Sequence, residues 1–136
     1  LYDLFPTLVE LSGAGSTLAD YLGPGKSLLP LLKGSRPAEF RDFHYAEMGN
    51  ARMVHNGRWK LVRYYERGGS YQDHWFDLAH PLGERRPAPA PSSNQQIQLV
   101  TALDLFFQKY EIANKSGKNI WDLPIHNSME AWRVEQ

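Results

Sequence analysis

Hydrophobic residues near the N-terminus recur at the spacing of a helix face. The stripe consists of Leu4, Phe5, Leu8 and Leu11. Asp3 is a suitable N-cap, Pro6 falls in the first turn, where a missing N–H is tolerated, and the glycines after Ser12 end the helix. A loop rich in Gly and Pro follows, and Pro30 limits the apolar stretch SLLPLLKG to a short segment.

The strongest local pattern is VHNGRWKLVRYY at residues 54–65, which predicts a β-hairpin. Its Asn-Gly pair suits the centre of a two-residue type I′ turn. Such a turn pairs Val54 with Trp59 and places Val54, Trp59 and Leu61 on one face of the sheet. The other face then carries His55, Arg58, Lys60 and Tyr64. We therefore expect one face to build a core and the other to be polar.

Further strands are expected on both sides of the hairpin, at residues 41–48 and in the segment HWFDLA. Residues 95–111 then show a helical period. Its apolar positions are Ile97, Val100, Leu103, Phe107 and Tyr110. The extended tail that follows contains Trp121 and Trp132 and is expected to pack onto another surface. The pattern predicts an α+β fold: a small antiparallel sheet of about four strands, covered by the C-terminal helix and preceded by another helix.

Composition and charge exclude several classes of protein. The 136 residues suffice for one ordinary globular domain, with 42% hydrophobic and 22% charged residues. Fifteen Lys and Arg balance fifteen Asp and Glu, so no net field attracts nucleic acid. No apolar run approaches the roughly 20 residues of a membrane span. We therefore expect neither nucleic acid nor a membrane as a partner.

The sequence contains no strong match to a catalytic, metal-binding or phosphate-binding motif. The absence of cysteine excludes a disulfide, a thiolate zinc site and a cysteine nucleophile from these residues. The sequence GPGKSL at residues 23–28 lacks the first glycine of a phosphate-binding loop, where Asp20 stands. No close helical pair of the kind that binds zinc is formed by the five histidines, His44, His55, His74, His80 and His126. No metal site or nucleophile–base pair is predicted.

Four short segments follow one another in a distinctive order: DLFPTL from Asp3, GKSLLPLL from Gly25, RMVHNGRWK from Arg52, and WFDL from Trp75, the last followed by HPLGE. Taken together they resemble the C-terminal part of type I sulfatases, the arylsulfatase family of the alkaline phosphatase superfamily. Two departures from the family's pattern are that Pro24 replaces an aspartate and that HPLGE lacks an Asp-Pro pair.

The resemblance implies a division of the chain. Residues 1–36 would be the end of a catalytic α/β domain, and residues 37–136 would be a C-terminal subdomain made of the sheet, the helix and the tail. The family's formylglycine nucleophile, its calcium ligands and its sulfate-binding Lys and His lie before the point that matches Leu1. The resemblance thus implies a calcium-dependent sulfate ester hydrolase whose catalytic, metal and cofactor residues lie outside this chain. It also favours a periplasmic or extracellular location.

Three residues are candidates for the rim of the parent enzyme's pocket, where they would contact a sulfated small molecule or glycan. His44, Glu47 and Arg52 fall on the first strand and the entry of the hairpin, which the resemblance places near the pocket mouth. Surface ion pairs are common and weak. We therefore expect a structural role for these residues more than a role in substrate specificity.

Two alternative functions remain open. One is a phosphonate or phosphodiester hydrolase of the same superfamily, which differs mainly in upstream residues. The other is a free-standing module that binds anionic glycans through its hairpin. For that function the polar side chains of the hairpin, His55, Arg58, Lys60 and Tyr64, would have to converge.

The apolar stripe of the first helix predicts a partner. If the C-terminal helix already covers the small sheet, this stripe has nothing to pack against, and large exposed apolar patches are uncommon on monomers. The chain also opens within a helix, as expected of a portion of a longer protein. We expect residues 1–32 to bind the N-terminal catalytic domain of the same sulfatase or to self-associate.

Overall fold

The computed structural model describes residues 2–35 and 40–110. Contacts divide the chain into two compact units, Leu1–Arg41 and Asp42–Gln136. The division falls between Arg41 and Asp42, whereas the resemblance implied a boundary after residue 36. Each unit is considered by itself below, as unit 1 and unit 2.

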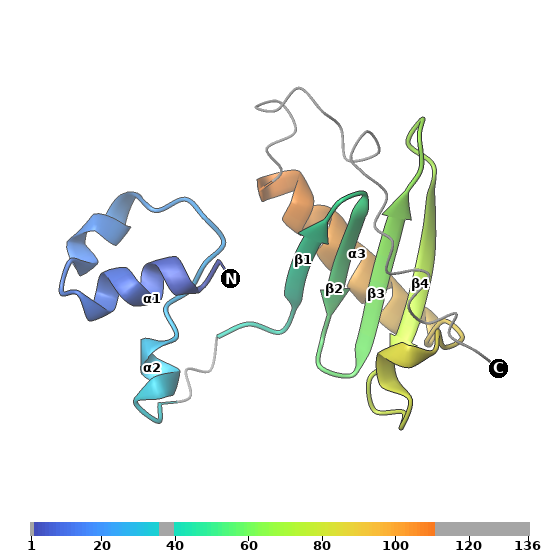
Figure 1. The fold of residues 1–136 in the computed structure, drawn as a ribbon, viewed down its shortest axis with the longest axis horizontal. Coiled ribbons are helices and arrows are strands. Elements are labelled where there is room, and N and C mark those ends of the chain that lie inside the picture. Colours follow the sequence, from blue (N-terminus) through green and yellow to red (C-terminus); the bar gives the residue numbers. More distant parts are fainter. Residues whose placement is uncertain (1, 36–39, 111–136) are drawn as a thin grey trace. The chain divides into compact units, whose positions relative to one another are not determined.

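Unit 1 contains helix α1 (Leu4–Leu11), the 3₁₀ helix η1 (Gly15–Asp20) and the short helix α2 (Leu29–Leu32) (Figure 1). Asp3 precedes α1 as expected, but its side chain does not cap the helix. Pro30 stands in the first turn of α2, which ends after only four residues.

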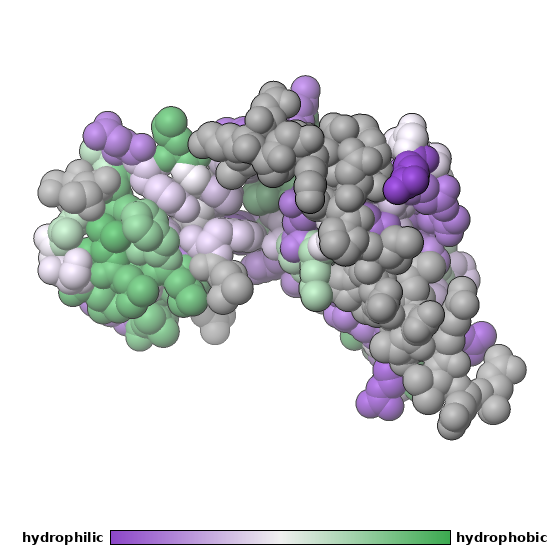
Figure 2. Space-filling model, turned by 45° about the horizontal axis from the view of Figure 1, so that its top comes forward, coloured by the Kyte–Doolittle hydropathy of each residue, from purple (hydrophilic) through white to green (hydrophobic). Residues whose placement is uncertain are grey.

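Part of the surface of unit 1 is an apolar patch (Figure 2, left). Its exposed large hydrophobic side chains are Leu4, Phe5, Leu8, Leu11, Leu22, Leu31 and Leu32. In α1 the buried residues are Pro6 and Thr7 rather than the leucines. The stripe that defines this helix in the sequence therefore faces outward.

Unit 2 is built around a four-stranded antiparallel sheet with strand order β1-β2-β3-β4 (Figure 1). The strands are β1 (His44–Met48), β2 (Ala51–His55), β3 (Trp59–Tyr65) and β4 (Tyr71–Asp77). The 3₁₀ helix η2 (Gly83–Arg85) and helix α3 (Ser93–Tyr110) follow, and α3 covers one face of the sheet. The predicted small α+β fold is confirmed, although β4 begins earlier than the HWFDLA pattern suggested.

The main core lies between the sheet and α3. Its buried members are Val54, Leu61, Trp75, Leu99, Leu103 and Phe107. Trp59 and Val100 pack against this cluster and are partly buried. The predicted facing of Val54, Trp59 and Leu61 toward the helix is confirmed. One helix position was wrong, because Ile97 is 64% exposed whereas Leu99 is fully buried.

The hairpin between β2 and β3 has a different register from the predicted one. Val54 pairs with Leu61 rather than with Trp59. The cause is Asn56, whose side-chain oxygen accepts the N–H groups of Arg58 and Trp59, at 3.1 and 2.9 Å. This places Asn56 before the turn instead of at its centre. Because the partner shifts by two residues, the side chains of both strands keep their predicted faces.

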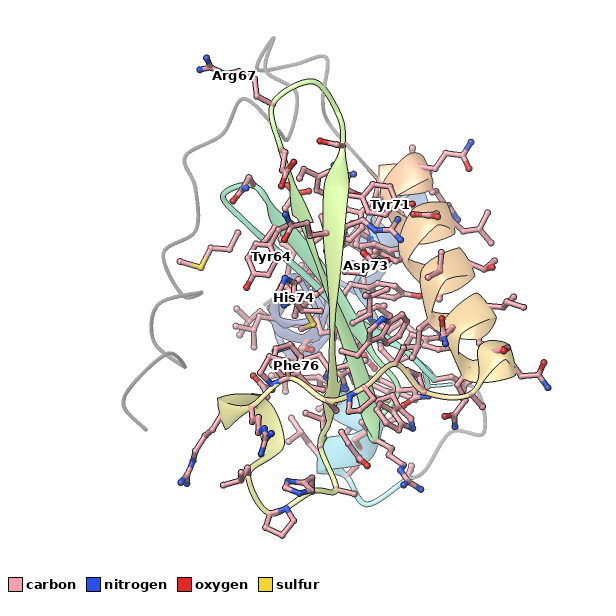
Figure 3. All side chains as sticks on the ribbon, turned by 90° about the vertical axis from the view of Figure 1, so that its right-hand side faces the viewer. Tyr64, Arg67, Tyr71, Asp73, His74 and Phe76 are labelled. Carbon is pink, nitrogen blue, oxygen red and sulfur yellow. The ribbon has the colours of Figure 1, made fainter. Side chains whose placement is uncertain are left out.

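The sheet face opposite α3 is not simply polar, contrary to expectation. It carries a second buried cluster formed by Ala51, Val62, Tyr64 and Phe76, with Met53 and Leu78 packed against it. Figure 3 shows Tyr64, His74 and Phe76 on this side, and Tyr71 and Asp73 on the side of α3. We call the side away from α3 the open face.

Helix α3 ends at Tyr110, and the predicted tail with Trp121 and Trp132 lies outside the described residues. Among the helices that are described, none has the length and apolar character required to cross a bilayer.

Candidate functional site

The interleaved cations of the hairpin are engaged in ion pairs. The pairs are Arg52 with Glu47 at 2.7 Å, Arg58 with Asp77 at 3.5 Å, Lys60 with Glu84 at 2.8 Å, and Arg63 with Asp73 at 2.7 Å. Each positive charge therefore already has a carboxylate neighbour within the unit. Such an arrangement supports the fold more directly than it attracts an anionic ligand.

Arg63 connects the sheet to the covering helix. Its side chain binds both carboxylate oxygens of Asp73 on β4, at 2.7 and 2.9 Å, and Asp104 on α3 at 2.9 Å. The guanidinium also lies 3.9 Å from the centre of the Tyr71 ring. Burial disfavours the charge on Arg63, but the hydrogen bonds and charge of Asp73, with Asp104, raise its pKa above the usual value. Arg63 thus links β3 to β4 and α3 and has a structural role.

Two of the three rim candidates form a pair on the α3 side of the sheet. Arg52 is only 8% exposed, and its guanidinium lies 4.5 Å from the centre of the Phe107 ring on α3. Glu47, which is exposed, accepts its Nε hydrogen bond. Arg52 is therefore stacked under the helix rather than projecting toward solvent.

The third candidate, His44, lies on the open face and is exposed. It pairs across the strands with His55, and the two imidazole rings stack with centres 4.8 Å apart. The structure thus does not bring His44 together with Glu47 and Arg52. Lys60, the cross-strand partner of His55, adds its ion pair with Glu84 to this end of the face.

The electrostatics of this polar end favour a neutral imidazole. Burial lowers the pKa of His55, and the neighbouring His44 and Lys60 lower it further, whereas Glu84 acts in the opposite direction. Of the four hairpin side chains that a glycan-binding module would need to converge, only His55 and Lys60 are direct cross-strand neighbours here. Arg58 pairs with Asp77 at the turn, and Tyr64 belongs to the apolar cluster.

Next to the polar end, the open face contains a groove of about 280 Å³. Its lining residues are Ala46, Met48, Ala51, Arg52, Met53, Lys60, Val62, Tyr64, Phe76 and Glu84. The groove crosses the sheet from the edge strand β1 to β4. Seven of its ten lining residues are apolar or aromatic, and the charged ones are Arg52, Lys60 and Glu84, a composition typical of sites for apolar side chains or small ligands.

Unit 1 contains a second set of built contacts, which join α1 to the segment before α2. The Asp3 carboxylate accepts the Lys26 N–H at 2.8 Å and pairs with Arg41 at 2.6 Å. The Thr7 hydroxyl accepts the Leu28 N–H at 2.8 Å. A Cβ on Gly25 would collide with the Tyr2 carbonyl oxygen, so this position requires glycine. These contacts hold the segment before α2 against α1, and none of them involves the leucine stripe of α1.

Sequence reasoning missed the groove because it treated the open face as polar. The signal was present, since Ala51, Met53, Val62 and Tyr64 are four apolar or aromatic residues at alternate positions of two paired strands. Side chains at successive positions of a strand point to opposite faces, and in this hairpin both faces carry hydrophobic residues. This is the pattern of a strand that is buried on both faces.

Within residues 2–35 and 40–110, no three His, Asp or Glu side chains gather closely enough to hold a metal ion. In comparisons with known proteins, no family model matches this chain and no curated protein is significantly similar to it.

Proposed function

We propose that this chain is the C-terminal portion of a type I sulfatase, a calcium- and formylglycine-dependent hydrolase of sulfate esters. Unit 1 would end the catalytic domain, and unit 2 would be the C-terminal subdomain. The formylglycine nucleophile and the calcium ion that stabilises charge on the sulfate would both belong to the preceding part of the protein. The role of this chain is then to support the catalytic domain.

One observation carries the proposal: polar residues of the four resembling segments bind one another. Asp3 and Thr7 of the first segment accept backbone N–H groups of Lys26 and Leu28 in the second. Lys60 of the third pairs with Glu84, which follows the fourth. The four segments are thus coupled in pairs, one pair in each unit, as expected if each pair is kept as a structural module.

Within this proposal, His44 is the rim candidate best suited to contact a substrate, because it is exposed and no ion pair within the described residues involves it. Arg52 and Glu47 would act by holding β1 and β2 against α3. In the complete enzyme, His44→Ala should change kcat/KM for the true substrate more than for a small aryl sulfate. Arg52→Ala should lower the stability and affect both substrates alike.

The proposal predicts that the 136-residue chain alone hydrolyses no sulfate ester. The test is a chromogenic aryl sulfate assay with calcium, run on this chain and on the product of the same gene extended upstream of Leu1. Activity of the extended protein alone, with a Cys/Ser-x-Pro-x-Arg motif in the added part, would support the proposal. Calcium-dependent turnover by the short chain, abolished by a substitution within residues 1–136, would refute it.

The same preparations separate the alternatives. An extended protein that cleaves an aryl phosphonate or phosphodiester in preference to a sulfate would belong to the other branch of the superfamily. Tight, salt-sensitive binding of the short chain to heparin would instead favour the glycan-binding module. We expect weak binding, because the cations Arg52, Arg58, Lys60 and Arg63 are already paired.

A further inference from the structure

The turn between β2 and β3 contains the one Asn-Gly pair of the chain, Asn56-Gly57. When glycine follows asparagine, the glycine nitrogen can attack the side-chain carboxamide with little hindrance, because glycine has no Cβ. Gly57 has a φ of 92°, a conformation in which other residues are strained. Asn56 is half-buried and Gly57 is exposed, so the pair is open to water.

Two backbone donors hold the carboxamide oxygen of Asn56. Its Oδ1 accepts the N–H groups of Arg58 and Trp59, at 3.1 and 2.9 Å. The first of these hydrogen bonds closes an Asx turn, which keeps the carboxamide beside the peptide bond between Asn56 and Gly57. Two fixed donors at this spacing also stabilise negative charge on the oxygen, as an oxyanion hole does for a tetrahedral intermediate.

An imidazole lies against the backbone nitrogen that would attack. The Gly57 N–H donates a hydrogen bond to Nδ1 of His55, at 3.2 Å. Nδ1 is therefore unprotonated, and the proton of the neutral ring is on Nε2. The N–H lies in the plane of its peptide group, whereas the electron pair that would attack is perpendicular to that plane. His55 can thus accept the proton without blocking the path to Asn56.

The surroundings of His55 keep this base available at neutral pH. Burial lowers the pKa of His55, and the neighbouring His44 on β1 and Lys60 on β3 lower it further. Glu84 in η2 acts in the opposite direction. The imidazole is consequently neutral near pH 7, as a general base must be.

We propose that Asn56 is a self-modification site, at which the Gly57 nitrogen displaces the side-chain amide nitrogen with His55 as the general base. The Gly57 nitrogen forms a bond to Cγ of Asn56, and His55 takes the proton from that nitrogen. His55 then gives the proton to the side-chain nitrogen, the Cγ–N bond breaks, and ammonia leaves a cyclic succinimide. Water opens the ring on either side and yields aspartate or isoaspartate at residue 56.

Both products change the hairpin. Aspartate adds a negative charge next to the exposed Arg58. Isoaspartate adds a methylene group to the backbone of a turn whose register depends on the Asn56 side chain. The reaction would therefore weaken the pairing of β2 and β3 as the protein ages. This inference rests on the turn alone and is independent of the proposed enzymatic function.

The test incubates the full 136-residue chain in ¹⁸O-enriched water and follows residue 56 by peptide mapping and mass spectrometry. We expect Asn56 to react at least about tenfold faster in the folded chain than in the same chain unfolded in guanidinium chloride, because only the fold supplies the base and the donors. Asn50, which is 7% exposed and precedes an alanine, is the internal control and should stay unmodified. A folded chain that reacts no faster than the unfolded one would overturn the proposal.

A His55→Gln variant tests the base separately from the turn. It should slow the reaction of the folded chain by at least about tenfold, since general bases contribute about 10²–10⁴-fold in enzymes. Backbone amide signals of β2 and β3 show whether the hairpin is retained. Between pH 7 and 8 the native rate should stay nearly constant, because the base is already neutral, whereas the variant should react faster as hydroxide increases. An unchanged rate in a folded variant, or a native rate that rises in proportion to hydroxide, would contradict the role of His55.

Discussion

Unit 1 and unit 2 differ in how far they bury their apolar side chains. Unit 2 places leucines, aromatic residues and valines in two clusters, one on each face of its sheet. Unit 1 buries Leu29 but exposes the leucine stripe of α1. Its internal order depends on backbone hydrogen bonds that the side chains of Asp3 and Thr7 accept and on a close approach at Gly25. Unit 2 therefore has the core of an independent fold, whereas unit 1 leaves much of its apolar surface exposed.

The largest expected effect is on the core of unit 2. Leu103→Ala removes a fully buried side chain of α3 and should lower the free energy of unfolding by about 2–5 kcal/mol. Ile97→Ala on the same helix is the matched control and should stay within about 0.5 kcal/mol, because Ile97 is exposed. Urea unfolding followed by tryptophan fluorescence measures both. Equal losses would contradict the facing of α3.

A second effect should be confined to unit 1. Gly25→Ala forces a methyl group onto the Tyr2 carbonyl and should destabilise this unit by about 1–3 kcal/mol, the usual cost of overpacking. Gly15→Ala is the control, since a Cβ there meets nothing within 4 Å. Amide exchange should become faster over residues 2–35 in the first variant and remain unchanged over β2 and β3. Faster exchange in the sheet as well would show that the two units unfold together.

The exposed stripe of α1 should govern association rather than stability. At rising concentration, light scattering on the 136-residue chain should show self-association, because isolated apolar patches of this kind tend to be buried between molecules. Replacing Leu8 and Leu11 with Asp should abolish it while changing the unfolding free energy of unit 2 by less than about 0.5 kcal/mol. A wild-type chain that stays monomeric would show that the stripe needs no partner.

The smallest effect concerns pH. Because the pKa of His55 is lowered in the folded state, the neutral imidazole stabilises the fold fully above its ordinary value of about 6.5, and this contribution is lost as the pH falls through the folded value. Between pH 7.5 and 5, the native protein should therefore lose more stability than a His55→Gln variant. Parallel urea titrations at the two pH values measure the difference, and identical losses would remove His55 as a cause.

The hairpin shows how far local sequence reasoning reaches. The Asn-Gly pair correctly located the turn, and alternation correctly placed Val54, Trp59 and Leu61 on the face of the helix. The register failed because two placements of Asn56 are compatible with a tight turn. Only the hydrogen bonds of its side chain to Arg58 and Trp59 select between them.

Local sequence patterns did not predict how the three rim candidates are arranged. His44, Glu47 and Arg52 are close in sequence, and the resemblance implied that all three lie near the pocket mouth. Antiparallel pairing puts Glu47 opposite Arg52 and His44 opposite His55, on different faces. Arg52 then stacks on Phe107, a residue distant in sequence that local patterns cannot connect to it.

The amino-acid sequence by itself determined the small α+β fold, the extent of its helices and strands to within a few residues, and the exclusion of cysteine chemistry, because periodicity and composition act locally. The tertiary structure decided which cations were paired and that the open face carries an apolar groove. Those features depend on which residues meet across strands and on which surfaces are covered. Contacts between segments that are distant in sequence determine the pairing and the covered surfaces. The local periodicity of hydrophobic residues does not specify these contacts.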